Sequence, residues 1–119
     1  MRPLFPEDIR ARLLANGELQ EPVRGTEDEI DFLPVVKLFT PDGACTWLLT
    51  EIDPDNPDIA FGLCDLGMGF PELGAVSLSE LASVRGRLGL PIERDLHFTP
   101  KRTLLAYARE AWAAGRIRA

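Results

Sequence analysis

The sequence predicts an α+β domain in which helices flank an antiparallel sheet of about four strands. Three observations lead to this fold class. Apolar residues recur every three or four positions near both ends of the chain, a spacing that is typical of amphipathic helices. The middle of the chain instead holds short apolar runs bounded by Pro, Gly, Asp or Asn, which is typical of β-strands. The connections between these runs are short, so we expect consecutive strands to pair antiparallel as a meander.

The first helix is predicted from about Pro6 to Asn16. Its apolar residues lie four positions apart and form one face: Phe5, Ile9 and Leu13. Pro6 suits the first turn of a helix, and Gly17 can take the left-handed conformation that ends one. The following residues, 18–31, are polar and rich in acidic side chains. We interpret them as a solvent-exposed connector.

The four strands are predicted in the middle of the chain, at residues 35–40, 46–53, 59–65 and 74–77. Pro41, Asp42 and Gly43 form a turn signal between the first two strands. Residues 54–58 contain two prolines and separate the next two strands. Residues 66–73 contain glycines and proline, and we expect a loop there.

Two helices are predicted after the sheet. Ser77 and Glu80 have the spacing of a capping box, in which Ser77 caps the helix and Glu80 reaches back to its amide. Gly86 should end this short helix. After an irregular segment at residues 89–98, the final helix should start at Thr99 and Pro100.

Length and composition fit a single domain over residues 1–119. A chain of 119 residues has no room for a second core of ordinary size, and 45% hydrophobic with 27% charged residues is typical of a globular protein. No apolar stretch approaches the roughly 20 residues that span a bilayer, and Glu7 and Asp8 precede any signal-like segment. The two cysteines, Cys45 and Cys64, should be free thiols. We therefore expect a cytoplasmic protein that does not associate with membranes.

The net charge of −6 is unevenly distributed along the chain. Residues 1–84 contain 5 Lys/Arg and 16 Asp/Glu, whereas residues 85–119 contain 8 and 3. The overall charge disfavours general nucleic-acid binding. A polyanion, if one binds, should bind the basic C-terminal region: Arg85, Arg87, Lys101, Arg102, Arg109, Arg116 and Arg118. The same asymmetry would allow head-to-tail self-association into a homo-oligomer.

One candidate metal site combines Glu51, Asp53 and Asp65. Strand alternation places four side chains on one face: Trp47, Leu49, Glu51 and Asp53. The hairpin register that fits these runs gives three facing pairs: Asp53 with Ile59, Glu51 with Phe61, and Trp47 with Asp65. Three carboxylates that converge in this way can bind a hard divalent cation. The simpler interpretation is that they are the solvated end of a hairpin.

A second candidate cluster contains Glu93, Arg94, Asp95 and His97. Our first interpretation is a structural clamp in which Arg94 holds a carboxylate through two hydrogen bonds. The alternative is a catalytic group in which Glu93 or Asp95 acts as a base beside His97. His97 is the only histidine of the chain, so one chain cannot provide a multi-histidine metal site.

Landmarks between residues 37 and 100 follow an order that resembles a bacterial family known as domain of unknown function 2958. They are Lys37, Phe39 and Pro41, then Trp47, Thr50-Glu51 and Asp53-Pro54, Phe61-Gly62-Leu63, Ser77-Leu78, Glu80-Leu81, Arg85-Gly86, Gly89-Leu90, Glu93-Arg94-Asp95, Phe98 and Pro100. The aromatic residues that this family often has before Ser77 are replaced by Ala75 and Val76. The resemblance implies a small bacterial protein associated with plasmids, phages or other mobile elements, and it supplies no catalytic residue.

Two functions follow as hypotheses, and whether the chain is an enzyme stays open between them. The first is an acidic, non-enzymatic interaction or accessory protein without a cofactor, which binds a partner such as a basic nucleic-acid-processing protein. Its candidate binding residues are Trp47, Arg94 and the acidic run Glu27, Asp28 and Glu29. The second is a metal-dependent, nuclease-like hydrolase with Glu51, Asp53 and Asp65 as ligands and the second cluster as catalytic group.

Overall fold

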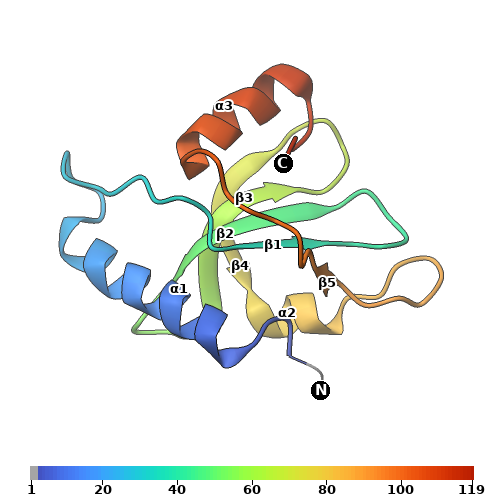
Figure 1. The fold of residues 1–119 in the computed structure, drawn as a ribbon, viewed down its shortest axis with the longest axis horizontal. Helices are drawn as coiled ribbons and strands as arrows, with labels where there is room; N and C mark the ends of the chain where they lie inside the picture. Colours follow the sequence, from blue (N-terminus) through green and yellow to red (C-terminus); the bar gives the residue numbers. More distant parts are fainter. Residues whose placement is uncertain (1–2) are drawn as a thin grey trace.

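The computed structural model describes residues 3–119, which form three α-helices, a short 3₁₀ helix and a five-stranded antiparallel sheet (Figure 1). The helices are α1 (Glu7–Gln20), the 3₁₀ turn η1 (Glu21–Val23), α2 (Leu78–Ser83) and α3 (Leu104–Ala114). The strands are β1 (Val36–Phe39), β2 (Thr46–Ile52), β3 (Ile59–Asp65), β4 (Glu72–Ser77) and β5 (Glu93–Arg94), in the order β4-β3-β2-β1-β5. The predicted α+β class, with its meander and three helices, is confirmed.

The fifth strand was not predicted. β5 pairs with β1 through Arg94 opposite Leu38 and Glu93 opposite Phe39. The Asp95 amide extends this pairing by donating to the Lys37 carbonyl at 2.9 Å. Two residues are too few to show the alternation by which a strand is recognised in a sequence.

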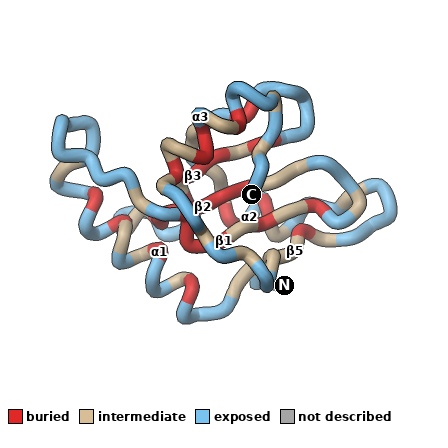
Figure 2. The backbone as a smooth tube through the Cα atoms, turned by 45° about the horizontal axis from the view of Figure 1, so that its top comes forward, coloured by how far each residue is buried: buried red, intermediate tan, exposed pale blue. Residues whose placement is uncertain are grey.

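The sheet is covered by α1 on one face and by α3 on the other (Figures 1 and 2). The core on the α1 side contains Leu13 and Leu49, whereas the core on the α3 side contains Leu48 and Ala108. β2 lies in the middle of the sheet and contributes to both cores, so six of its seven residues are buried. Among residues 3–119, no helix combines the length and the apolar character needed to cross a bilayer.

Gly17 does not end the first helix, contrary to the prediction. α1 continues to Gln20, and Gly17 lies buried against β2. A Cβ atom at this position would overlap the carbonyl oxygen of Ile52. Glycine is therefore required by the close approach of α1 to β2, because any side chain would push the helix away from the sheet.

A β-bulge at Thr50 changes the predicted facing of β2. Leu49 pairs with Gly62 and Glu51 pairs with Phe61, so Thr50 is an extra residue on one strand. The bulge reverses the alternation, and Leu49 and Ile52 consequently both join the core on the α1 side. The predicted shared face of Trp47, Leu49, Glu51 and Asp53 was therefore wrong, although the pairing of Glu51 with Phe61 is confirmed.

The helix starts agree only in part with the sequence. Ser77 caps α2 as predicted, because its hydroxyl accepts a hydrogen bond from the Glu80 amide at 3.2 Å. This helix ends at Ser83, before Gly86. Thr103 caps α3, whose first residue is Leu104. The prediction that α3 starts at Thr99 and Pro100 was wrong, because the Thr103 hydroxyl accepts the capping hydrogen bond from the Ala106 amide.

Candidate functional site

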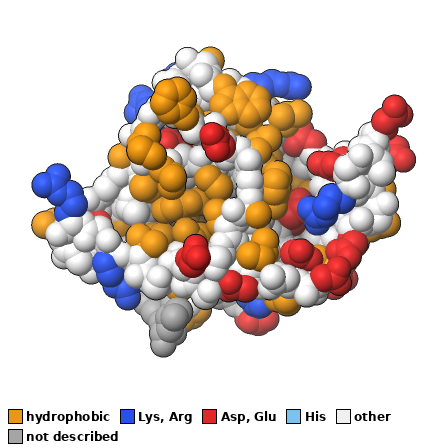
Figure 3. Space-filling model, turned by 180° about the vertical axis from the view of Figure 1, so that it is seen from behind, with side chains coloured by type: hydrophobic (Ala, Val, Ile, Leu, Met, Phe, Trp, Pro, Cys, Tyr) orange, Lys and Arg blue, Asp and Glu red, His pale blue; other side chains and the backbone are white. Residues whose placement is uncertain are grey.

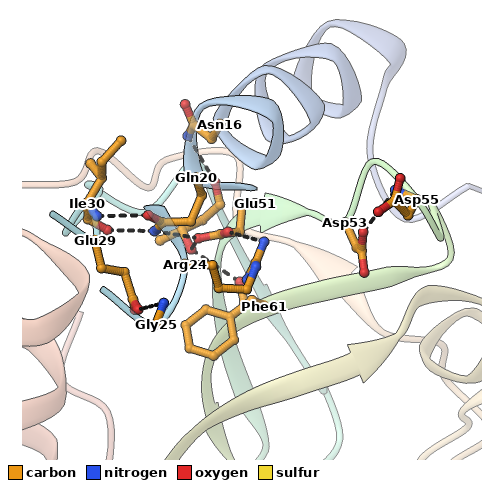
Figure 4. Close-up of polar contacts among 11 residues, drawn as sticks. Asn16, Gln20, Arg24, Gly25, Glu29, Ile30, Glu51, Asp53, Asp55 and Phe61 are labelled. Carbon is orange, nitrogen blue, oxygen red and sulfur yellow. Dashed lines mark hydrogen bonds and ion pairs between the residues drawn. The ribbon is translucent and has the colours of Figure 1, made fainter. Parts of the chain in front are cut away.

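Glu51 lies at the centre of a polar network between β2 and the connector (Figure 4). Its side chain is only 3% exposed, and one carboxylate oxygen lies 3.2 Å from the Arg24 guanidinium. The other oxygen accepts hydrogen bonds from the Gln20 amide and the Thr50 hydroxyl, both at 3.4 Å. Burial raises the pKa of Glu51, while the contacts with Gln20 and Arg24 act in the opposite direction. Each charge-bearing oxygen thus has a partner, as a structural carboxylate requires.

The same network closes the connector into a loop. The Gln20 side chain donates to the Ile30 carbonyl and accepts from the Ile30 amide, both at 2.8 Å. Inside the loop, the Glu29 carboxylate accepts from the Gly25 amide at 2.7 Å. Glu27 and Asp28 are exposed. Of the acidic run that was predicted to bind a partner, Glu29 therefore has a local role, and Glu27 and Asp28 remain available.

The predicted cluster of Glu51, Asp53 and Asp65 was wrong, because the three carboxylates lie at different places. Asp53 lies beyond the end of β2 and points away from Glu51 (Figure 4), where it accepts from the Asp55 amide at 2.9 Å. Asp65 pairs with Thr46, at the opposite end of β2. Its carboxylate accepts from the amides of Gly67 and Ile117, at 2.8 and 2.9 Å. The bulge and these separate partners leave no common point for one cation.

A different acidic group occurs where β2 turns into β3. Carboxylate oxygens of Glu21, Asp53 and Asp55 lie within 4.8 Å of one another. A hydrogen bond with Asp55 is the main cause that raises the pKa of Glu21. Glu21 belongs to η1, about thirty residues away in the chain, so local spacing offered no sign of it. Such exposed acidic groups are common at hairpin ends, and this group alone does not identify a metal site.

The second predicted cluster forms a different ion pair from the expected one. Lys37 lies 3.4 Å from the Asp95 carboxylate. The His97 amide donates to Asp95 at 2.9 Å, and these contacts lower the pKa of Asp95, with the His97 hydrogen bond as the largest cause. Arg94 forms no ion pair within residues 3–119. The prediction that Arg94 clamps a carboxylate was therefore wrong, and Lys37 takes that role.

Asp95 and His97 lie in a depression that is lined by residues of the paired strands β1 and β5 and of the turn between β1 and β2. This depression has a volume of about 500 Å³, and Lys37, Arg94 and Cys45 also line it. A second depression of about 550 Å³ adjoins it, since Asp95 and His97 line both. We call the two together the β1–β5 cleft. Glu93 lines neither part and instead borders a depression near Pro6, so the predicted group of Glu93, Asp95 and His97 does not share one site.

Trp47 is not available for a partner, contrary to the prediction, because it is 4% exposed and packs in the core. Large apolar side chains are exposed in several other parts of the molecule, and four of them lie in the β3–β4 loop and on α3. They are Leu66 at 55%, Met68 at 70%, Phe70 at 81% and Trp112 at 49%. The Trp112 indole donates to the Pro71 carbonyl at 2.9 Å, which fastens the loop to α3. We call these four residues the loop–helix patch.

Basic side chains accompany this patch. Arg109 lies three residues before Trp112, a spacing that places the two on the same side of α3, whereas Arg116 follows the Gly115 cap; both arginines are exposed. Figure 3 shows hydrophobic side chains gathered over α3 and the sheet below it, with basic side chains beside them at the top. Leu66, Met68 and Phe70 alternate within a glycine-containing loop. Their apolar character was the signal in the sequence that could have revealed the patch.

The fold and surface define a small α+β domain with an exposed apolar surface. The family model for a protein of unknown function (DUF2958) matches residues 4–118. The chain therefore belongs to this family, and the match extends well beyond the landmarks at residues 37–100. No curated protein and no solved structure matches the chain.

Proposed function

We propose that this protein is a non-enzymatic interaction protein that binds another protein through the loop–helix patch. The observation that carries the proposal is the exposure of Met68, Phe70 and Trp112 on a loop and a helix that the hydrogen bond from Trp112 to Pro71 holds together. Leaving such side chains in water is unfavourable unless a partner covers them. An accessory role in plasmids, phages or other mobile elements is the setting that the family resemblance implies.

The composition of the patch supports a protein partner. Trp, Phe, Met and Arg are enriched at the centres of protein interfaces, where a few aromatic anchors supply most of the binding free energy. The arginines at positions 109 and 116 flank the aromatic residues and favour a partner surface that is both apolar and acidic. Exposed carboxylates such as Glu27 and Asp28 act mainly on association rate and specificity, so they are secondary in this proposal.

The alternative function, a metal-dependent hydrolase, required that Glu51, Asp53 and Asp65 converge, and they lie apart. Glu51 is engaged with Arg24, and Asp65 is engaged with backbone amides at the other end of β2. A hydrolytic metal centre needs ligands that converge and leave an open coordination position. The interaction function is therefore the one that the geometry favours.

A photo-cross-linking residue in place of Phe70 tests the proposal in cells that make the protein. A matched probe in place of Leu88, which is 79% exposed on a different loop, serves as the control. We expect a specific cross-linked protein from position 70 and none of comparable yield from position 88. With that partner purified, Phe70→Ser should weaken binding by about thirtyfold, as for an interface anchor, whereas Leu88→Ser should not. Equal cross-linking at both positions, or equal affinity of both variants, would refute the proposal.

A further inference from the structure

The β1–β5 cleft is a second surface whose chemistry differs from that of the patch. Its first depression lies against β1 and the turn before β2, with Phe39 and Thr46 in its wall. Its second depression lies between the segment that leads into α3 and the C-terminal residue Ala119. Figure 1 shows this orange segment crossing beside β1, with the C-terminal end close by. The two depressions form one continuous open cleft, because they share Asp95 and His97.

The cleft is strongly cationic although the chain as a whole is acidic. Its lining includes five basic side chains: Lys37, Arg94, Lys101, Arg102 and Arg118. The only carboxylate side chain in that lining is Asp95. A chain with a net charge of −6 has thus placed five of its 13 Lys/Arg around one cleft. Such a concentration of one sign of charge in a cleft attracts an anionic ligand.

Three of these cations lack an internal partner. Lys37 lies 3.4 Å from the Asp95 carboxylate and donates to the Ala119 carbonyl at 2.7 Å, and Arg102 lies 2.7 Å from the Glu110 carboxylate. Within residues 3–119, Arg94, Lys101 and Arg118 form no ion pair. Arg94 lines the first depression, whereas Lys101 and Arg118 line the second. Free positive charge is therefore present in both halves of the cleft, as a ligand with more than one anionic group would require.

Flat side chains lie between and beside these charges. His97 is exposed and lines both depressions, Phe39 lines the first, and Phe98 lines the second. Aromatic or imidazole rings together with cations in one open groove are the features by which proteins hold unpaired bases and their phosphates. We propose that the β1–β5 cleft binds a short segment of single-stranded nucleic acid, with phosphates at Arg94 and at Lys101 and Arg118 and a base stacked on His97.

Fluorescence anisotropy with a labelled oligothymidylate at low salt tests this proposal. We expect saturable binding whose affinity falls with salt, with a slope of log K against log salt of about −2, as three phosphate contacts to a single strand imply. Arg94→Glu and Lys101→Glu should each weaken binding by about tenfold or more. Arg12→Glu makes the same change of charge at an exposed position of α1, outside the cleft, and should change affinity by less than about twofold. Circular dichroism confirms that each variant is folded.

Several results would overturn the proposal. They are the absence of saturable binding at low salt, and an equal loss of affinity in Arg12→Glu, which would show a general effect of net charge. Displacement by thymidine monophosphate or inorganic phosphate as readily as by oligothymidylate would show a site for a single phosphate instead. Displacement by polyglutamate at equal charge concentration would show a site for acidic protein segments. The loop–helix patch is separate from this cleft, so a Phe70→Ser variant should bind the oligonucleotide normally.

Discussion

The guanidinium of Arg24 and the carboxylate of Glu51 lie 3.2 Å apart, with the arginine 46% exposed and the glutamate 3% exposed. A side chain of the connector thus supplies the charge that a buried side chain of β2 needs. Removal of one partner from such a pair leaves the other without compensation, which is more costly than removal of both.

Arg24→Ala should lower the free energy of unfolding by about 1–3 kcal/mol at pH 7. Burial raises the pKa of Glu51 in the folded protein, so this group favours folding below its unfolded pKa and loses that contribution as the pH rises through the folded pKa. The cost of Arg24→Ala should therefore shrink as the pH falls toward about 4, where Glu51 is protonated. Urea denaturation at several pH values measures this change in the free energy of unfolding. In a Glu51→Gln background, Arg24→Ala should lower the free energy of unfolding by less. A loss that is the same at every pH and in both backgrounds would contradict the role of Arg24 as the partner of the Glu51 charge.

Gly17→Ala should destabilise the protein by about 1–3 kcal/mol, because the added Cβ overlaps the Ile52 carbonyl oxygen. Alanine is by itself about 1 kcal/mol more favourable than glycine inside a helix, so the sign of the effect is informative. The neighbouring Glu18→Ala, at an exposed position of the same helix, should change stability by less than about 0.5 kcal/mol. A stabilised Gly17→Ala variant would show that α1 can move away from β2.

Asp58 fixes the start of α2 from another part of the chain. Its carboxylate accepts from the Ser77 hydroxyl at 2.7 Å and from the Ser79 amide and hydroxyl at 3.0 Å. The hydrogen bond from Ser77 is the main cause that lowers the pKa of Asp58. This group therefore stabilises the fold above its unfolded pKa, and the contribution is lost as the pH falls through the folded pKa.

Asp58→Ala should accordingly lower Tm at neutral pH, and the difference from the unmodified protein should decrease below about pH 4. Asp55→Ala is a matched control on the same hairpin that does not contact α2, and it should lower Tm less. Differential scanning calorimetry across this pH range provides the comparison. Equal effects of the two substitutions would mean that the hairpin charge, and not the α2 cap, is responsible.

The two thiols should differ in reactivity. Burial raises the pKa of Cys64 to about 11, so almost none of it is thiolate at pH 8, and thiolate is the reactive form. Both thiols are partly exposed, but Cys45 lines the open β1–β5 cleft. Alkylation of the folded protein at pH 8 should modify Cys45 first and Cys64 only after unfolding, as peptide mass spectrometry can show. Cys45→Ser should remove the early modification; rapid labelling of Cys64 in the folded protein would contradict its raised pKa.

Local signals in the sequence predicted the meander well. The bounds of β3 were predicted as the structure has them, because turn residues mark both of its ends and its residues have strong strand propensity. Ser77 was recognised as a helix cap for a similar reason, since a cap depends on residues three positions apart. Such features need no knowledge of distant parts of the chain.

The arrangement of the candidate site residues could not be predicted, because it depends on a β-bulge and on contacts between distant parts of the chain. A single extra residue at Thr50 turned Glu51 away from the face of Trp47, and a bulge of this kind has no sequence signature here. The pairing of Arg24 with Glu51 and of Lys37 with Asp95 joins residues far apart in the chain. The sequence shows that these residues are charged, but only the tertiary structure shows which of them pair.

The brevity of β5 has a consequence for the cleft beside it. Two residues pair β5 with β1, whereas β2 and β3 pair along most of their length. Segments held by few backbone pairs open locally at a free energy well below that of global unfolding. The wall that carries Arg94 should therefore be the part of the sheet whose amides exchange fastest with deuterated solvent. A ligand that spans the cleft should slow that exchange at Arg94 more than a ligand bound at the loop–helix patch would, because it holds this briefly paired wall directly.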